Sequence, residues 1–387
     1  MGIGVFRAEM PVAQEHAYFD HAAVAPLPEA AAERLRKYAD QVSQSGDKHW
    51  LEWSLIVSRL RTAAAQLLGA NECEVALVPN TTIGINLVAE GFPWKSGDNL
   101  VVPDNEFPSN LLPWKNLQRR GVEVRLLPVS DTGEISIDQL VALMDHRTRL
   151  VALSWVGFVS GFRLDLPRVA EAVHRRGALL FVDAIQGLGA FPIQVHDAQI
   201  DFLAADGHKW MLGPEGAGLL YVAEKHLDLL ESLLIGWNSL SEGAFDPRSA
   251  HLKASAARYE GGSYNMAGLL AFEASLELLL RLGSHLAASP VAAAILENVA
   301  TIAGQLAGQG FDLKVPSEEF RSGILTTSWP GATSSDLNAA RKHCLEKNVI
   351  LSVRAGRIRI ATHAYNNADD IARLVTALVE ARQLFSH

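Results

Sequence analysis

The sequence predicts an α/β protein with a mostly parallel sheet sandwiched by helices, followed by a smaller α+β C-terminal domain. Between residues 75 and 223, short apolar runs alternate with helical patterns. Repeated strand–helix–strand spacing is typical of a parallel sheet. The runs are apolar throughout, as expected for strands that are buried on both faces. Past Gly262 the alternation stops and long helical patterns take over.

The elements of the first part follow in a regular order. The predicted strands cover residues 75–79, 99–104, 122–129, 149–156, 178–183, 201–206 and 218–223. The predicted helices between them begin near residue 82, pass through residues 111–117, and cover 137–144 and 166–176.

The C-terminal part has a different pattern of predicted elements. Residues 267–283 predict a strongly apolar helix that could serve as a spine between two lobes, and 289–310 predict another helix. Strands within 323–330 and 356–363 flank a helix over 334–348, which begins with serine N-cap candidates and ends at Asn348. We expect a large domain over residues 16–262 and a small domain formed by 1–15 and 263–387.

Composition narrows the function classes. The chain has 387 residues and a net charge of −9, which argues against nucleic acid or an anionic membrane as the main partner. No apolar stretch approaches the roughly 20 residues needed to span a bilayer. Cys73 and Cys344 are the only cysteines, which suits a reducing compartment, and we expect a cytoplasmic protein. The thirteen histidines lack metal-binding spacing, so no metal site is expected.

Lys209 is the residue that first suggests chemistry. It follows an apolar, strand-like segment and precedes a Gly/Pro-rich loop in LAADGHKWMLGPEGAGLLYV. Burial disfavours the charged ammonium, so we expect a lowered pKa for Lys209. A neutral lysine amine attacks carbonyls and forms Schiff bases. A solvated lysine after a strand is the ordinary alternative.

Asp183 ends another apolar run, in FVDAIQG, and Gln186 follows one turn later. An ionised aspartate beside a pyridine nitrogen keeps that nitrogen protonated, and Gln186 could donate a hydrogen bond to a phenolic oxygen. A Schiff-base lysine and such an aspartate are the minimum that pyridoxal phosphate (PLP) chemistry requires. Ligands of open α/β sheets bind at the carboxyl ends of the strands, where Asp183 and Lys209 fall. An aspartate that caps a turn is the ordinary alternative.

Further polar loops fall at the same predicted edge. Thr81 and Thr82 lie at the start of a helix, whose N-terminus suits a phosphate. Phe107, in NEFPSN, could stack on a flat ring. Asp206 and His208 precede the lysine, and His208 could contact the phosphate or assist proton transfer. The ordinary alternatives are a helix cap for the two threonines, a core position for Phe107 and a turn position for His208.

Two loops nearer the C-terminus complete the candidate site. In YEGGSYN, Gly262 frees the backbone and Ser263 offers a hydroxyl to a phosphate. Arg357 and Arg359 lie two residues apart, so on a strand they share a face, and one could hold a substrate carboxylate. Two solvated arginines on an edge strand are the alternative. A competing dinucleotide motif fails, because Pro192 occupies its third glycine position.

Taken together, these segments resemble the class V aminotransferase family of fold-type I PLP enzymes, which includes cysteine desulfurase-like proteins, isopenicillin N epimerase-like proteins and kynureninases. The resemblance runs from YFDHAAVAPLP at residue 18 to YNNADDIARLV near the C-terminus. It rests on the ordered set TTIGINLVAEG, EFPSNLLPW, FVDAIQG, DGHKWMLGPEG, EGGSYN and RIRIATHAYN. It implies a fold-type I PLP transferase with an amino-acid substrate, and a homodimer with shared active sites.

The resemblance also implies residue roles. Lys209, Asp183 and His208 would be catalytic, and Ser263 would reach the phosphate of the neighbouring subunit. The cofactor-binding residues would be Thr81, Thr82, Phe107, Trp155, Asp183, Gln186, Asp206, His208, Lys209, Gly262 and Ser263. The substrate would contact Arg359, His21 and Ala23.

Two departures bear on the reaction. Desulfurases carry an attacking cysteine in the segment that here reads VRAGRIRIATH, and this segment has none. Trp155 stands where desulfurases have an asparagine. We therefore expect an aminotransferase first. The alternatives are a cysteine or cystine C–S lyase that lacks the catalytic cysteine, and a PLP-binding protein without catalysis.

Overall fold

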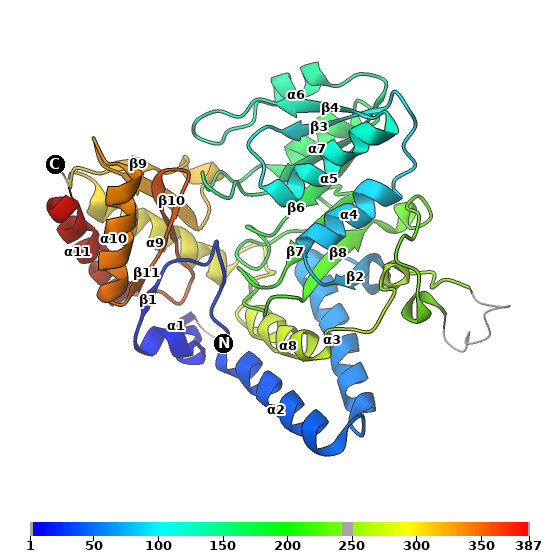
Figure 1. Cartoon of the computed structure of the whole chain (residues 1–387), viewed down its shortest axis with the longest axis horizontal. Helices are drawn as coiled ribbons and strands as arrows, with labels where there is room; N and C mark the ends of the chain where they lie inside the picture. Colours follow the sequence, from blue (N-terminus) through cyan, green and yellow to red (C-terminus); the bar gives the residue numbers. More distant parts are fainter. Residues whose placement is uncertain (1–2, 242–250, 386–387) are drawn as a thin grey trace.

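A seven-stranded sheet forms the centre of the larger lobe of the computed structural model, which describes residues 3–241 and 251–385 (Figure 1). Its strands are β2 (Val75–Val78), β3 (Asn99–Pro103), β4 (Glu123–Leu127), β5 (Thr148–Ser154), β6 (Leu179–Asp183), β7 (Phe202–Asp206) and β8 (Gly218–Val222). Their order is β2-β8-β7-β6-β5-β3-β4. The pairs from β7 to β4 are parallel, and β8 is antiparallel to both neighbours. The predicted mostly parallel sheet is therefore confirmed.

Helices bury both faces of this sheet. Successive strand residues point to opposite faces, so Leu180 and Val182 join one core cluster while Phe181 joins the other. One face is covered by α3 (Trp50–Leu68), α6 (Ile137–Leu143), α7 (Leu166–His174) and α8 (Met266–Arg281), and the other by α4 (Thr81–Gly91) and the short α5 (Leu112–Asn116).

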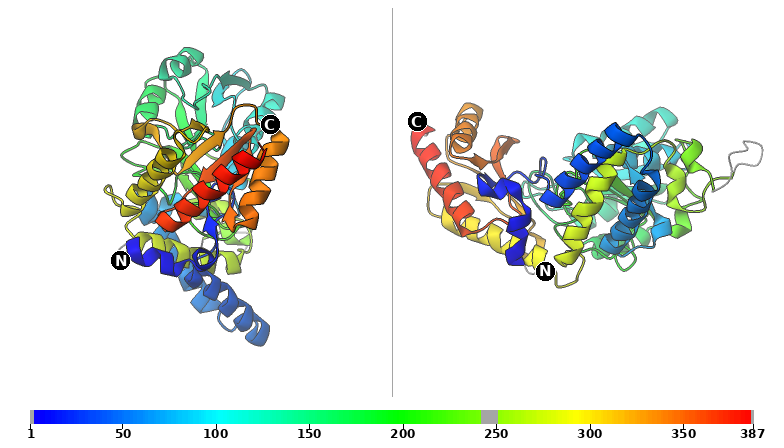
Figure 2. Two further views of the ribbon diagram at one scale, coloured as in Figure 1. Left: turned by 90° about the vertical axis from the view of Figure 1, so that its left-hand side faces the viewer. Right: turned by 90° about the horizontal axis from the view of Figure 1, so that it is seen from below.

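Helix α8 packs against α3 and against α2 (Glu29–Ser45), and Figure 2 shows these three helices side by side on the underside of the large lobe. The sequence patterns did not predict α2 and α3. Among the residues that the structure describes, no helix has both the length and the apolar composition needed to cross a bilayer.

The smaller lobe is an antiparallel sheet covered by helices, which confirms the predicted α+β architecture. The strand order is β12-β13-β10-β9. Its strands are β9 (Asp312–Lys314), β10 (Ile324–Ser328), β12 (Ser352–Arg354) and β13 (Arg357–Ala361), and its helices are α9 (Pro290–Leu306), α10 (Ser334–Glu346) and α11 (Ala368–Phe385). The N-cap of α10 is Thr333 and not one of the predicted serines, because its hydroxyl accepts a hydrogen bond from the Asp336 N–H.

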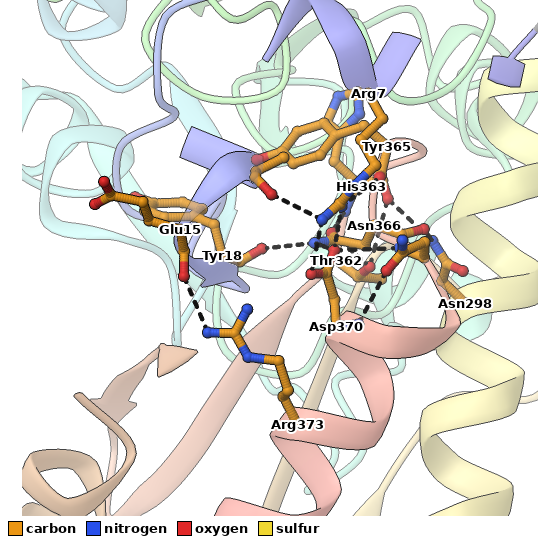
Figure 3. Close-up of polar contacts among 12 residues, drawn as sticks. Arg7, Glu15, Tyr18, Asn298, Thr362, His363, Tyr365, Asn366, Asp370 and Arg373 are labelled. Atoms are coloured by element: carbon orange, nitrogen blue, oxygen red, sulfur yellow. Dashed lines mark hydrogen bonds and ion pairs between the residues drawn. The ribbon is translucent and has the colours of Figure 1, made fainter. Parts of the chain in front are cut away.

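The N-terminal segment is tied to this smaller lobe by polar contacts (Figure 3). The Arg7 guanidinium lies 2.5 Å from the buried carboxylate of Asp370 on α11. The Asn366 amide donates to the backbone oxygen of Tyr18. In addition, β1 (Ala17–Tyr18) pairs in parallel with β11 (Val349–Ile350), while α1 (Ile3–Phe6) precedes the Arg7 contact. The predicted domain limits stay a prediction, although β1 contacts the smaller lobe and α8 the larger one.

Candidate active site

Lys209 lies in the turn after β7, and it is partly buried. Loss of hydration on burial lowers the pKa of its ammonium group to about 8. Nearby Asp183 acts in the opposite direction, and Arg359 reinforces the lowering. The Nζ atom lies 5.8 Å from the centroid of the Phe107 ring. Lys209, Asp183, Phe107 and Arg359, which come from four separate segments, therefore meet in one place.

Asp183 is the last residue of β6, and only 3% of its surface is exposed. Burial raises the pKa of its carboxyl group to about 6, while a hydrogen bond from the Ile185 N–H and the charge of Lys209 work against that rise. A carboxyl group in this state changes charge easily when a cationic partner arrives.

Gln186 is held in place by two hydrogen bonds. Its Nε2 donates to the Ala22 carbonyl at 3.0 Å, and its Oε1 accepts from the Trp210 indole at 2.9 Å. The second proton on Nε2 has no part in these bonds, so this side chain can still donate to a ligand. The contacts also bring the loop around predicted residue Ala23 close to the lysine turn, since the Ala25 N–H donates to the His208 carbonyl.

The predicted phosphate end forms around the N-terminus of α4. The Thr81 hydroxyl accepts a hydrogen bond from the Asp206 N–H at 2.8 Å, and the exposed Thr82 hydroxyl donates to Ser109 at 2.9 Å. His208 Nδ1 lies 3.0 Å from Asp206 Oδ2, yet their alignment is too poor for a hydrogen bond.

His208 Nδ1 and the other carboxylate oxygen, Asp206 Oδ1, are both buried without a hydrogen-bond partner. Such atoms destabilise a protein unless a ligand or water satisfies them. The residues present therefore fit a phosphorylated group bound at this helix N-terminus.

Arg359 also presents an unpartnered group to the site. The residue is 2% exposed, Nη1 donates to the Phe158 carbonyl at 3.0 Å, and Nη2 lies 3.4 Å from Asp20. Its Nε is buried without a partner. By contrast, the Arg357 guanidinium is paired with Asp312 at 2.7 Å.

Two predicted contact residues, His21 and Trp155, are packed against other parts of the protein. His21 has no exposed surface, and both ring nitrogens are used: Nδ1 donates to the Ala361 carbonyl at 3.1 Å and Nε2 accepts from the Tyr365 hydroxyl at 2.9 Å. With both nitrogens in these contacts, its predicted substrate contact stays a prediction. Trp155 is 4% exposed and packs in the core, where a Cβ at Gly187 would lie 2.4 Å from its Cε3 atom. Its predicted cofactor contact stays a prediction.

Gly262 and Ser263 lie in a different place from the lysine. They line an apolar groove of about 470 Å³ together with Leu77, Ile83 and Leu234, and Lys209 is not among the lining residues. Both are exposed, so their predicted contact with a neighbouring subunit stays a prediction.

Sequence reasoning passed over two carboxylates that adjoin the predicted residues. Asp20 accepts a hydrogen bond from the Ser352 hydroxyl at 2.7 Å and lies beside Arg359. Glu106 directly precedes Phe107 and accepts two hydrogen bonds from Ser154. The signal used for Asp183, an acidic residue that ends an apolar run, would have selected Asp104 and not Glu106, which lies three residues beyond β3.

Comparison with known proteins decides the family. The model of the family Aminotransferase class-V matches residues 17–374. The chain belongs to the class V aminotransferase family. Pyridoxal phosphate is accordingly the cofactor of this class V enzyme, as predicted.

Several relatives share most of their length with this class V enzyme. A probable cysteine desulfurase of Methanothermobacter thermautotrophicus is 31% identical over 281 residues, which is 72% of this chain and 70% of that protein. The crystal structure of the Escherichia coli cysteine desulfurase CsdA superimposes with a TM-score of 0.87 at 27% identity, covering 100% of this chain and 99% of that one.

A complex of the cystine C–S lyase C-DES with its product cysteine persulfide has the same fold, with a TM-score of 0.89 at 22% identity over 96% of this chain and 99% of that one. The predicted fold-type I architecture is thus confirmed. The first expectation, an aminotransferase, is not supported, because these relatives are named as desulfurases or C–S lyases.

Proposed function

We propose that this PLP-dependent enzyme is a C–S lyase that cleaves cysteine, cystine or a related sulfur amino acid by β-elimination. One observation carries the proposal: a lysine, an aspartate and an arginine with an unpartnered nitrogen converge, while neither of the chain's two cysteines is suited to accept sulfur. The names of the relatives support a sulfur amino acid as substrate.

The state of the two thiols separates this proposal from a desulfurase that forms a protein persulfide. Cys344 has no exposed surface on α10, and burial raises its pKa to about 12. Cys73 lies before β2, and burial with two neighbouring glutamates raises its pKa too. The thiolate is the reactive form, so both are poor nucleophiles. The chain between β12 and β13 is a two-residue turn, Ala355–Gly356, which offers no long loop for a mobile thiol.

The geometry supports one proposed role for each residue of the site. Lys209 would hold PLP covalently, Asp183 would face the ring nitrogen, Gln186 would donate to the phenolic oxygen, and Phe107 would lie against the ring. Thr81, Thr82 and His208 would bind the phosphate, near Asp206. When bound, PLP supplies the electron withdrawal that makes the substrate Cα–H acidic.

The chain's own residues would then act on the substrate. The Arg359 guanidinium binds the α-carboxylate and so fixes the orientation of Cα. The substrate amine would displace Lys209 from the cofactor, and the freed Lys209 amine, which burial makes easier to deprotonate, would remove the Cα proton. The Cβ–S bond breaks and its electron pair leaves with sulfur, and the remaining enamine takes up water to give pyruvate and ammonia.

We also propose a homodimer, located in the cytoplasm. The groove that contains Gly262 and Ser263 adjoins exposed apolar side chains at Leu234, Ile235 and Trp237, which are 52%, 62% and 48% exposed. Exposed apolar clusters of this kind are typical of protein interfaces. A second subunit there would bring Ser263 to the partner's phosphate site.

The test is to incubate the PLP-loaded enzyme with a panel of amino acids and no oxo-acid acceptor. The proposal predicts pyruvate, ammonia and a thiol, persulfide or sulfide from cysteine or cystine. Conversion of the cofactor to its amine form, without pyruvate, would instead identify an aminotransferase and contradict the proposal.

A matched control tests the role of the thiols. The double variant Cys73→Ser/Cys344→Ala should keep turnover within about twofold, since neither thiol contacts the site. Intact mass spectra taken during turnover should show no added sulfur on the wild-type chain. Loss of turnover in the folded double variant, or a sulfur adduct on either cysteine, would contradict the proposal.

A further inference from the structure

The chain that follows β5 forms a short hairpin of residues 156–163, none of which has a role in the proposed reaction. Val156 and Arg163 form an antiparallel bridge at its base. Inside it, the Gly157 N–H donates to the Phe162 carbonyl at 3.0 Å. The hairpin is therefore closed by its own backbone contacts, and what matters next is where its two ends are fixed.

Arg163 fastens this hairpin to the smaller lobe. Its backbone N–H donates to the Phe320 carbonyl at 2.7 Å. Its side chain donates twice more, from Nε to the Arg321 carbonyl at 3.0 Å and from Nη2 to the Glu319 carbonyl at 2.9 Å. The neighbouring Phe162 ring stacks on Phe320, with the ring centroids 4.9 Å apart. The base of the hairpin is thus bonded to the segment that leads into β10.

Gly161 makes a second contact with the smaller lobe, against β10. A Cβ at this position would overlap the carbonyl oxygen of Ile324, the first residue of that strand. The φ angle of Gly161 is +69°, in the left-handed region that favours glycine. A side chain at position 161 would therefore push the hairpin away from β10.

The tip of the hairpin contacts two residues of the candidate active site. The Phe158 carbonyl accepts a hydrogen bond from Arg359 Nη1 at 3.0 Å, and the Phe158 ring meets the Phe107 ring edge-on, with the centroids 5.3 Å apart. Arg359 Nη2 lies 3.4 Å from Asp20. These contacts engage both terminal nitrogens of the guanidinium and leave the buried Nε–H for a ligand.

We propose that Arg163 is a positioning residue for substrate binding. By fastening the hairpin to the smaller lobe, it holds the Phe158 carbonyl against Arg359 and so directs the unpartnered Nε–H toward the substrate carboxylate. An arginine side chain has several rotatable bonds, and fixing them before the ligand arrives removes part of the entropy cost of binding. The inference rests on the proposed function, in which Arg359 binds the α-carboxylate.

The experiment compares two ligands of the PLP-loaded enzyme that differ by one carboxylate, glycine and methylamine. Their dissociation constants are measured from the change in cofactor absorption, which requires no turnover. Arg163→Ala should weaken glycine binding by about 10-fold, the effect of losing roughly one hydrogen bond to a charged group, and should leave methylamine binding within about twofold. A purely structural role for Arg163 would weaken the binding of both ligands alike.

A double-mutant cycle tests whether Arg163 acts through Arg359. Arg359→Ala should weaken glycine binding more than Arg163→Ala does. In the Arg359→Ala background, Arg163→Ala should cause no further loss, because two residues that serve one interaction have non-additive effects.

A second variant and a matched control keep the test independent of one substitution. Gly161→Ala displaces the hairpin from β10 by a different route, so it should reproduce the selective loss of glycine binding. Arg168 is an exposed arginine on α7. Arg168→Ala should therefore leave both dissociation constants within about twofold of the wild type.

Unchanged glycine binding in folded Arg163→Ala and Gly161→Ala variants would overturn the proposal, as would equal weakening of glycine and methylamine or simple addition of the losses in the double variant. If only Arg359→Ala weakens glycine binding, the positioning role fails while the role of Arg359 stands. Absent C–S cleavage, with the selective effect on glycine intact, would contradict the proposed reaction alone.

Discussion

Two clusters of buried and partly buried polar groups differ in how they are satisfied. In the smaller lobe, Arg7, Asp370 and Asn366 all have hydrogen-bond partners within the chain (Figure 3). Around Lys209, the atoms Asp206 Oδ1, His208 Nδ1 and Arg359 Nε are buried with none. Buried groups that are fully paired stabilise a fold, whereas unpaired ones cost stability unless a ligand completes them. Unpartnered atoms also occur in the smaller lobe, at Trp329 Nε1 and Arg382 Nε, so it is the convergence of three such atoms around Lys209 that favours a ligand there.

The largest effect is expected at Lys209 itself. Lys209→Ala removes both the covalent attachment of PLP and the amine that takes the Cα proton. We expect C–S lyase turnover to fall by about 10³-fold or more and the visible band of the bound cofactor to be lost. A variant with wild-type turnover in a steady-state pyruvate assay would place the reaction elsewhere.

A substitution in the cluster around Asp370 should lower the stability of the protein and leave its turnover unchanged. Asp370→Ala leaves the Arg7 guanidinium without its buried partner, and removing one member of such a pair costs about 3 kcal/mol of unfolding free energy. Chemical denaturation measures this loss, and turnover of the folded fraction should be unchanged. Asp369→Ala, at the exposed neighbouring position, is the control and should cost little.

At Lys209, by contrast, a substitution should raise the stability of the apoprotein. Because burial lowers the pKa of Lys209 from 10.5 to about 8, its charged form destabilises the folded apoprotein below pH 8. This cost fades as the pH rises from about 8 to 10.5, so wild-type apoprotein should gain stability over that range.

Lys209→Met should remove this pH dependence and stabilise the apoprotein at neutral pH by at most about 3 kcal/mol. Denaturation curves at neutral and alkaline pH provide the measurement. If Lys209→Met is less stable than the wild type at neutral pH, Lys209 is not a destabilising ligand-binding group.

The smallest of these effects concerns the two arginines of β13. Arg359→Ala should lower kcat/KM by about 30-fold, which corresponds to roughly 2 kcal/mol for a charged hydrogen bond to the substrate. Arg357→Ala should cost less, because Asp312 already occupies that guanidinium. Equal losses in the two variants, measured with the same substrate, would show that Arg359 does not bind the carboxylate specifically.

The sequence was sufficient where local patterns carry the information. Lys209 and Asp183 each follow an apolar run, and in a parallel sheet the carboxyl ends of the strands share one edge, so their meeting is predictable. The long-range contacts were not. Glu106 reaches Ser154, 48 residues away, because β3 and β5 are neighbours in the sheet order, which the sequence pattern does not reveal.

The directions of side chains were also not predictable from the sequence. Trp155 immediately follows a strand end at the site, yet its indole turns into the core because Gly187 leaves room for it. His21 likewise packs among Trp210, His363 and Tyr365. An aromatic residue next to a site can therefore support the fold without touching a ligand.

The most direct test of this account is to reduce the PLP-loaded protein with borohydride, digest it and locate the modified lysine by mass spectrometry. The account predicts a phosphopyridoxyl group on Lys209, within the peptide that contains His208 and Trp210. A modification confined to another lysine, with Lys209 unmodified, would contradict the assignment of the active site.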